Sequence, residues 1–381
     1  MRALEGIKVL DFSVGHDASA ATMYMADHGA EVIKIENSAV GGDVARTWEP
    51  IKNGKSAYFE LLNRGKKSVA LDFTQPETLD TLLKLVEKVD VVVDNLGVKP
   101  LDEMGLTYEA MAKVNPNVIY AKLTPFGMTG PKRDDPATEY TMFAYSGYLQ
   151  VTGFPEEMPT IPSYPIMGYS FAHFLLGAVG AALIARITTG RGQMLDLSKA
   201  DLAVSMLEDR YASYQHEHID SRRVGNAHPT ITPYDTIACK DGYCNISPST
   251  PQMWEDFCRV LGFPEITHIH EYEDLELRQF AWFNGDLKDR TLKAMSKYTK
   301  VEAAKLLNDV GIPASPVWTV GEAYNSEQFA VKGVVVKKHD EVLGDYAVPS
   351  SLGQMSATPA DVTAPAPALG ADNESVLGSI Q

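Results

Sequence analysis

The sequence is poor in cysteine, and its excess charge is negative rather than positive. Its three cysteines, Cys239, Cys244 and Cys258, are too few for a disulfide framework, and no histidine stands beside them at zinc-finger spacing. The net charge of −16 over 381 residues argues against a nucleic-acid partner, because a phosphate backbone requires a basic face. We therefore expect no metal site, no nucleic-acid partner and a reducing compartment.

Long apolar runs are also missing. The longest, residues 171–187, contains His173 and Arg186 and is short for a membrane span. We expect it to form a buried helix. Residues 1–11 lack the pattern of a signal peptide. These absences predict a soluble, cytoplasmic protein that does not bind membranes.

Several catalytic motifs are absent. The loop after the first expected strand reads DFSVGHD at residues 11–17, which is not the GxGxxG of dinucleotide dehydrogenases. The chain also has no GxxxxGK[ST] phosphate loop, no GxSxG nucleophile elbow and no HExxH zinc motif. The sequence therefore disfavours dehydrogenases, P-loop enzymes, α/β-hydrolases and zinc proteases.

Strands alternate with helices over the first 125 residues. Short apolar runs predict strands at residues 7–12, 31–36, 68–73, 90–94 and 117–123. Such alternation is typical of an α/β protein with a parallel, doubly wound, Rossmann-like sheet. Ligands of these sheets bind at the carboxyl ends of the strands, so a site is expected in the loops that follow them.

The helix expected after the third strand has two signals. The string TQPE at residues 74–77 matches a capping box with a proline in the first turn. The apolar face of that helix would consist of residues at helical spacing, namely Leu79, Leu82, Leu83 and Val86. We therefore expect the helix to begin at this string.

The later part of the chain has a different pattern. Residues 229–316 read as a smaller α+β unit, with a hairpin turn at 240–242 and amphipathic helices at 254–261 and 289–307. The expected domains are a large Rossmann-like domain at 1–225, completed by 326–381, and a small α+β domain at 226–325.

Short strings over nearly the whole chain resemble one family in their order and spacing. They are LEGIKVLD at 4–11, GAEVIKIE at 29–36, KKSVALD at 66–72, DNL at 94–96, FGMTGP at 126–131, SG at 146–147, TGRGQ at 189–193, GNAHP at 225–229, KDGY at 240–243, GIPA at 311–314 and PAPALG at 365–370. Together they resemble the class III (carnitine/formyl type) CoA-transferase and α-methylacyl-CoA racemase family.

The resemblance implies an assembly and a substrate. Members of this family form interlocked dimers, in which two chains thread through each other, and they bind coenzyme A or acyl-CoA at the carboxyl edge of the sheet. Such a site must meet several phosphate charges with backbone N–H groups and lysines. Carried over by position, the CoA-binding residues would be Val14, Gly15, His16, Lys66, Lys67, Asn95 and Leu96.

The chain departs from the family at the catalytic position. The transferases use an aspartate that forms a mixed anhydride and then an aspartyl-CoA thioester. By position that aspartate corresponds to Gly168, and no acidic residue lies between Glu157 and Asp196. The racemases pair an acid in this region with a histidine near position 138, where this chain has Thr138. The remaining candidate for a relocated acid is Glu139.

Two further departures concern the CoA phosphates. Glu103 and the pair Asn37-Ser38 stand where many relatives have arginines. Both changes weaken the case for a full CoA site in this chain. The alternative is that Glu103 is a solvated surface acid and that other lysines, such as Lys99, take over.

Three functions stay open. The first is a subunit of a class III CoA-transferase that lacks the nucleophile and supports an aspartate-bearing paralogue in a heterodimer or heterotetramer, as in benzylsuccinate CoA-transferase. The second is a CoA-thioester transferase or isomerase with a relocated acid such as Glu139. The third is a non-catalytic binding or regulatory protein. We expect the first, and the sequence leaves open the acid substrate and any activity of the chain alone.

Overall fold

The computed structural model of the chain describes residues 1–351 and 353–380. These residues form two units. Residues 149–161, which the sequence analysis assigned to the large domain, lie with the second unit. The large unit comprises Met1–Tyr148, Pro162–His218 and Ala330–Gln381, and the second unit comprises Leu149–Ile161 and Ile219–Phe329.

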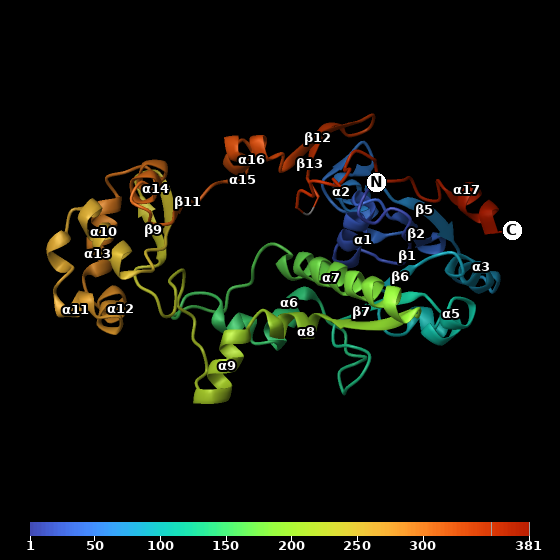
Figure 1. Ribbon diagram of the computed structural model, residues 1–381, viewed down its shortest axis with the longest axis horizontal. Helices are drawn as coiled ribbons and strands as arrows, with labels where there is room; N and C mark the ends of the chain where they lie inside the picture. The colour runs from blue at the N-terminus through green and yellow to red at the C-terminus, as the bar shows by residue number, and fades with distance from the viewer. Residues whose placement is uncertain (352, 381) are drawn as a thin grey trace. The chain divides into compact units, whose positions relative to one another are not determined.

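A six-stranded sheet organises the large unit, and all its strand pairs are parallel (Figure 1). The strand order is β5 (Lys67–Leu71), β2 (Glu31–Asn37), β1 (Lys8–Asp11), β6 (Val91–Asp94), β7 (Ile119–Thr124) and β8 (Gln193–Ser198). The chain thus builds outward from β1 to β5 and then returns to β6 on the other side of β1. This is the order of dinucleotide-binding sheets, and it confirms the predicted parallel α/β sheet.

Helices cover both faces of this sheet. α1 (Asp17–Asp27) and α7 (Ile166–Thr189) lie against one face (Figure 1). α3 (Glu77–Val86) and α5 (Tyr108–Val114) pack on the other face, in one core with strand residues. Shorter elements of the large unit are β3 (Ile51–Lys52), β4 (Lys55–Ser56), α2 (Ala57–Asn63), α4 (Pro100–Glu103), α6 (Glu139–Tyr145), α8 (Lys199–Ser205), α9 (Glu208–Glu217), β12 (Val335–Asp340), β13 (Gly344–Pro349) and α17 (Asn373–Leu377).

The C-terminal segment pairs with β5, the edge strand of the sheet. Asp372 accepts the N–H of Ser68 through its carboxylate and donates its own N–H to the Ser68 carbonyl, both at 2.9 Å. The side-chain amide of Asn373 likewise accepts from Ala70 N at 2.8 Å and donates to Ala70 O at 3.1 Å. The returning chain therefore satisfies backbone groups that an edge strand would leave open.

The second unit contains a small antiparallel sheet and most of the later helices. Strands β9 (Asp235–Cys239) and β10 (Gly242–Ile246) form the predicted hairpin, with Cys239 opposite Gly242. β11 (Ala314–Pro316) pairs with the other side of β10. The helices are α10 (Pro251–Leu261), α11 (His270–Glu273), α12 (Leu275–Asn284), α13 (Leu287–Met295), α14 (Lys300–Asn308), α15 (Val320–Tyr324) and α16 (Glu327–Lys332), which ends in the large unit.

Two helix predictions were wrong in detail. The expected capping box at Thr74 does not form, because the Thr74 hydroxyl donates to Asp72 at 2.7 Å and α3 begins only at Glu77. The single helix expected over 289–307 is interrupted between α13 and α14. There Thr299 and Glu302 make a reciprocal capping box that starts α14. In both places a local side-chain hydrogen bond decides where the helix begins.

α7 is apolar around its whole circumference but is buried on one face only. By length and composition this helix could cross a membrane. One face packs on α1 and the sheet, whereas Ile184 and Ile187 on the remaining surface are 68% and 84% exposed. The expectation of a fully buried helix is therefore wrong for that surface. The buried residues are Met167, Gly168, Phe171, Ala172, Leu175, Val179 and Ala182.

Candidate active site

Two loops meet where the strand order reverses, between β1 and β6. Asn95, after β6, accepts the N–H of Val14 and donates to the Val14 carbonyl, both at 2.8 Å. Gly15 N donates to Asp43 Oδ1 at 3.0 Å. Gly15 has a φ of +74°, and a Cβ there would lie 3.2 Å from the ring of Trp48. The structure thus brings together the predicted residues Val14, Gly15 and Asn95, whereas Leu96 packs into the core beside α3 and α5.

A buried lysine is hydrogen-bonded to residues on both sides of the loop after β1. The ammonium of Lys66 donates to Asp11 Oδ2 and Asn63 Oδ1, each at 2.9 Å, and to the Ser19 carbonyl at 3.0 Å. Burial lowers the pKa of Lys66 to about 8, although Asp11 opposes this effect. All three ammonium protons are used within the protein, so Lys66 has none left for a phosphate. Its neighbour Lys67 lies partly exposed and contacts Glu31 at 2.5 Å.

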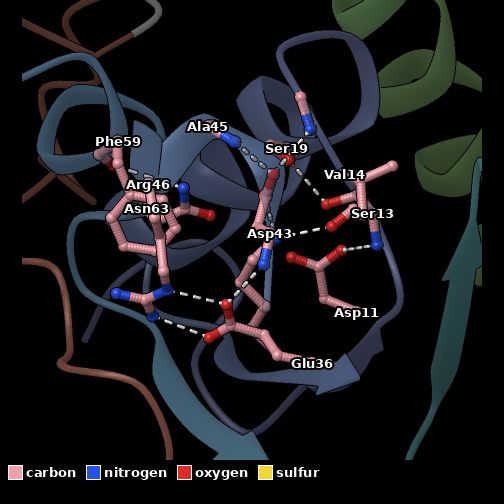
Figure 2. Close-up of polar contacts among 12 residues, drawn as sticks. Asp11, Ser13, Val14, Ser19, Glu36, Asp43, Ala45, Arg46, Phe59 and Asn63 are labelled. Atoms are coloured by element: carbon pink, nitrogen blue, oxygen red, sulfur yellow. Dashed lines mark hydrogen bonds and ion pairs between the residues drawn. The ribbon is translucent and has the colours of Figure 1, made fainter. Parts of the chain in front are cut away.

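An arginine that the sequence analysis did not single out lies beside this network (Figure 2). Arg46 forms a two-pronged ion pair with Glu36, with N–O distances of 2.8 and 2.7 Å, and its guanidinium lies 3.8 Å from the ring centre of Phe59. Arg46 also donates to the Pro367 carbonyl at 3.2 Å. The loop after β2 therefore contains a cation, but its charge is already matched inside the protein.

Glu139, the candidate acid, closes the N-terminus of α7. Its Oε1 accepts the N–H of Met167 and its Oε2 accepts the N–H of Gly168, both at 3.1 Å. These N–H groups belong to the first turn of a 24-residue helix and have no partner within the helix. A carboxylate at the positive end of the helix dipole is favourable. Glu139 therefore acts as a side-chain cap of α7.

Three more charged side chains surround this cap. His16 Nε2 lies 2.9 Å from Asp17 Oδ1 and 3.5 Å from Glu139 Oε2. Lys199, at the start of α8, contacts Asp17 Oδ2. Burial lowers the pKa of His16, but Asp17 and Glu139 outweigh it and raise the pKa to about 9. Burial raises the pKa of Asp17, but His16 and Lys199 outweigh it and lower the pKa to about 2.

These charges balance without an added ion. The donor atoms of His16, Asp17 and Glu139 lie within 4.8 Å of one another, a spacing that a metal ion could use. At neutral pH, however, protonated His16 and Lys199 match the two carboxylates. The arrangement is a compact ion-pair cluster at the carboxyl edge of the sheet, on the N-terminus of α7.

Gly168 lies directly beneath this cluster. A Cβ on Gly168 would lie 2.4 Å from atoms Cδ2 and Nε2 of His16 and 2.5 Å from Asp17 Oδ1. Unbonded atoms do not approach so closely, so a side chain at 168 would displace His16, Asp17 or both. The absence of a side chain at Gly168 and the presence of His16 and Asp17 are therefore one structural feature.

Several aromatic side chains lie near Gly168. Tyr169 stacks on Tyr164 with ring centres 5.5 Å apart, and its hydroxyl lies 3.2 Å from that of Tyr58. Tyr58 in turn stacks on Trp48, and the ring centres of Trp48 and His16 are 6.1 Å apart. Burial and the Tyr58 hydroxyl raise the pKa of Tyr169 above its usual value. Tyr169 is therefore a neutral aromatic wall and no nucleophile at neutral pH.

Comparisons with known proteins agree with this geometry. Residues 4–373 match the family model described as CoA-transferase family III. The chain belongs to the class III CoA-transferases. Over its full length it is 30% identical to succinyl-CoA:glutarate CoA-transferase of Mus musculus, of which it covers 87%. It is 28% identical to a Chloroflexus aurantiacus protein named succinyl-CoA–L-malate CoA-transferase alpha subunit, over 98% of this chain and 88% of that protein.

The solved structures give the same family. The chain superimposes on a CaiB/BaiF family protein from Brucella suis with a TM-score of 0.88 and 27% identity, over the full length of both chains. The activity of a class III CoA-transferase is to move CoA between carboxylic acids. Acyl-CoA substrates are implied for this chain by its family.

Sequence reasoning missed two members of the cluster in this class III CoA-transferase. Asp17 stands next to His16, and Lys199 is the first residue after β8. Both positions follow the carboxyl ends of sheet strands, and that rule was the signal available for them. Their meeting depends on how α1, α7 and α8 pack, and 182 residues separate Asp17 from Lys199.

Proposed function

We propose that this chain is the subunit of a two-chain class III CoA-transferase that lacks the aspartate on α7 and supports an aspartate-bearing paralogue. The observation that supports it is the cluster over Gly168. A Cβ there would lie 2.4 Å from the His16 ring, so an aspartate at 168 is both missing and sterically excluded in this arrangement. An aspartate at the family position on α7 would then be supplied by another chain.

The surface of α7 supports a partner. Ile184 and Ile187 are exposed on a helix that is apolar throughout, and Phe174 adds to the same kind of surface. Exposed apolar surface of this kind is typical of protein–protein interfaces. We propose that an aspartate-bearing paralogue covers it in an interlocked dimer. One relative, from Chloroflexus aurantiacus, is named as an alpha subunit, which supports this proposal.

Native purification from the source cell tests the partnership. The tagged full-length chain should bring down a second class III chain in equal amount. CoA transfer from succinyl-CoA, the donor named for the mouse relative, should be at least ten times faster with both chains than with this chain alone. Recovery of this chain as a homodimer only would overturn the proposal.

Variants of the apolar surface sharpen the test. Ile187→Asp should abolish co-purification, because a buried unpaired charge in an interface is strongly unfavourable. Val331→Asp is the matched control, since Val331 in α16 is 81% exposed and lies outside α7. A partner that is lost equally with both variants would contradict the assignment of α7 to the interface.

The second candidate, a transferase or isomerase that uses Glu139 as its acid, has less support. Each oxygen of Glu139 already accepts a backbone N–H of α7. Attack by this carboxylate would uncap a long helix. The third candidate, a binding or regulatory protein, predicts neither a partner nor turnover, so the purification above separates it from the first.

A further inference from the structure

We propose that Asp17 supplies a carboxylate nucleophile for a site in this chain itself, in place of the aspartate missing from α7. The inference rests on the CoA-transfer chemistry of the proposed function but not on the paralogue. A two-chain enzyme would then have one site with an aspartate on α7 of the paralogue and a second site with Asp17 of this chain.

The position of Asp17 Oδ1 carries the inference. In an aspartate the carboxylate oxygens lie about 2.4 Å from Cβ, given a C–C bond of about 1.5 Å and C–O bonds of about 1.2 Å. A Cβ built on Gly168 would lie 2.5 Å from Asp17 Oδ1. Asp17 therefore places an oxygen at the distance at which the oxygen of an aspartate at 168 would lie. The carboxylate has moved from the first turn of α7 to the first turn of α1.

The partner of the same oxygen is the ring of His16. Asp17 Oδ1 is buried, and His16 Nε2 lies 2.9 Å away as its ion-pair partner. Asp17 Oδ2 is held by Lys199. Among the described residues no backbone N–H bonds to Asp17 Oδ1, so movement of the His16 ring alone would make this oxygen available. The low pKa of Asp17 keeps it ionised and ready to attack.

Glu139 does not meet the same conditions. Both of its oxygens accept backbone N–H groups of α7, whereas Asp17 is held by two side chains, His16 on Oδ1 and Lys199 on Oδ2. Tyr169 is excluded because its raised pKa keeps the hydroxyl protonated. Of the described acidic and phenolic groups next to Gly168, Asp17 is therefore the one whose charged oxygen is exposed by the movement of a single side chain, His16.

The chemistry balances with the substrates of the family. An oxygen of Asp17 attacks the carbonyl carbon of the donor acyl-CoA, the C–S bond breaks, and CoA leaves as a thiolate. The thiolate attacks the Asp17 carbonyl carbon of the resulting anhydride and releases the donor acid as a carboxylate. The carboxylate of the second acid then attacks the aspartyl-CoA thioester, which forms a second anhydride and releases CoA as a thiolate. The thiolate attacks the acyl carbon of the second acid in this anhydride, so that a new acyl-CoA forms and Asp17 is released as a carboxylate. No oxidant, reductant or net proton is needed.

Access to the oxygen requires a local movement. Asp17 Oδ1 lies 2.5 Å from the position of a Cβ on Gly168 and 2.9 Å from His16 Nε2, so the His16 ring must turn outward when a thioester enters. The side chain of His16 is 22% exposed. On the side of Trp48 its neighbour is an aromatic ring rather than a charged group. His16 is thus a positioning residue that covers the nucleophile until substrate binds.

Trapping in the wild-type protein tests the proposal directly. The full-length chain, alone and together with its co-purified partner, is incubated with succinyl-CoA and then with hydroxylamine, which converts an aspartyl anhydride or thioester into a hydroxamate. Peptide mass mapping should place the label on Asp17. A label on Glu139, or an unlabelled chain in both preparations, would overturn the proposal. This result needs no variant and does not depend on folding.

Variants then give the magnitude. Asp17→Asn should lower labelling by roughly 10⁴-fold or more, as removal of a nucleophile does in acyl-transfer enzymes. Asp209→Asn, an exposed aspartate on α9, is the control and should label as the wild type does. Combining Asp17→Ala and Gly168→Asp with His16→Ala, which removes the ring that a side chain at 168 would meet, should restore labelling, now at position 168. Labelling of Asp17→Asn at the wild-type level would also overturn the proposal.

The two proposals fail separately. Co-purification of a paralogue without a label on Asp17 would remove this inference and leave the partnership. A label on Asp17 in a chain that has no paralogue would remove the partnership and leave this inference.

Discussion

Glu139 and Gly168 are joined by a hydrogen bond of 3.1 Å, from the first turn of α7 to a carboxylate that starts α6. The second oxygen of Glu139 binds Met167 N, so one side chain satisfies two open donors of the longest helix. This contact holds the N-terminus of α7 next to the loop that contains His16. It involves Gly168, the position that corresponds to the aspartate nucleophile of the family.

Removal of this cap should destabilise the large unit. Glu139→Ala is expected to lower the free energy of unfolding by about 1–2 kcal/mol, because two helix N–H groups and a favourable dipole contact are lost. Glu139→Gln should lose less, since an amide oxygen still accepts. Urea unfolding measures both, with Glu341→Ala in the exposed turn after β12 as the control. An equal effect of Glu139→Ala and the control would contradict the capping role.

Gly168 should tolerate no side chain while His16 is present. Gly168→Ala is expected to destabilise by about 1–3 kcal/mol through overpacking against His16 and Asp17. Gly177, in the same helix, has nothing within 4 Å of a built Cβ. Gly177→Ala should therefore stabilise, by up to about 1 kcal/mol, since alanine is the better helix former.

A double-mutant cycle tests whether Gly168 and His16 share one space. If they do, the cost of Gly168→Ala should fall when His16→Ala is also present, with a coupling energy of about 0.5–3 kcal/mol. Thermal unfolding of the four proteins gives this number. Additive effects of the two substitutions would show that the space is not shared.

The charge of His16 should make stability depend on pH in a defined window. Its pKa is raised from 6.5 in the unfolded chain to about 9 in the folded one. The contribution is therefore complete below pH 6.5 and is lost as the pH rises toward 9, with a size of up to about 3 kcal/mol. The difference in unfolding free energy between wild type and His16→Asn should shrink over that window.

The buried pair of Arg64 and Asp27 should dominate the ion-pair energetics of α1. The guanidinium donates to both carboxylate oxygens, at 3.0 and 2.7 Å, and the two side chains are 1% and 2% exposed. Asp27→Asn should cost about 3–5 kcal/mol, because it leaves a buried charge unpaired. The exposed pair of Lys305 and Asp309 is the comparison, and Asp309→Asn should cost less than about 1 kcal/mol. Equal costs would contradict this ranking.

CoA binding should be weak in the isolated chain and should improve with charge. Lys66 is committed to Asp11, Asn63 and Ser19, and Arg46 is committed to Glu36. Glu103 is exposed where relatives have an arginine. Glu103→Arg should tighten CoA binding about tenfold or more, since one charge-assisted bond contributes about 1.5–3 kcal/mol. Calorimetry measures the change, and a wild-type dissociation constant in the micromolar range or tighter would contradict the expectation.

Patterns with a short range in sequence predicted most of the fold. The alternation of apolar strands and helices indicated a parallel sheet, and the turn at Asp241-Gly242 indicated the hairpin of β9 and β10. Helix starts were harder, because Thr74 and Thr299 carry the same kind of signal. Only Thr299 caps a helix, since the hydroxyl of Thr74 is taken by Asp72.

The candidate site was only partly predictable from sequence. The strand-end rule led to the loop that contains His16, and the family spacing led to Gly168. The missing carboxylate was sought near α7, whereas Asp17, which has an oxygen next to Gly168, belongs to α1. Such proximity depends on how two helices pack across a sheet, and no spacing within either helix contains that information.

The pairing of residues 372 and 373 with β5 sets the order in which the protein can mature on the ribosome. The edge of the sheet stays uncovered through synthesis of the intervening three hundred or so residues, since Asp372 and Asn373 follow β5 at that distance in the sequence. A nascent chain therefore presents an open strand edge while the second unit is still being made. The backbone groups of β5 that Asp372 and Asn373 occupy are therefore satisfied late, by residues far away in the sequence.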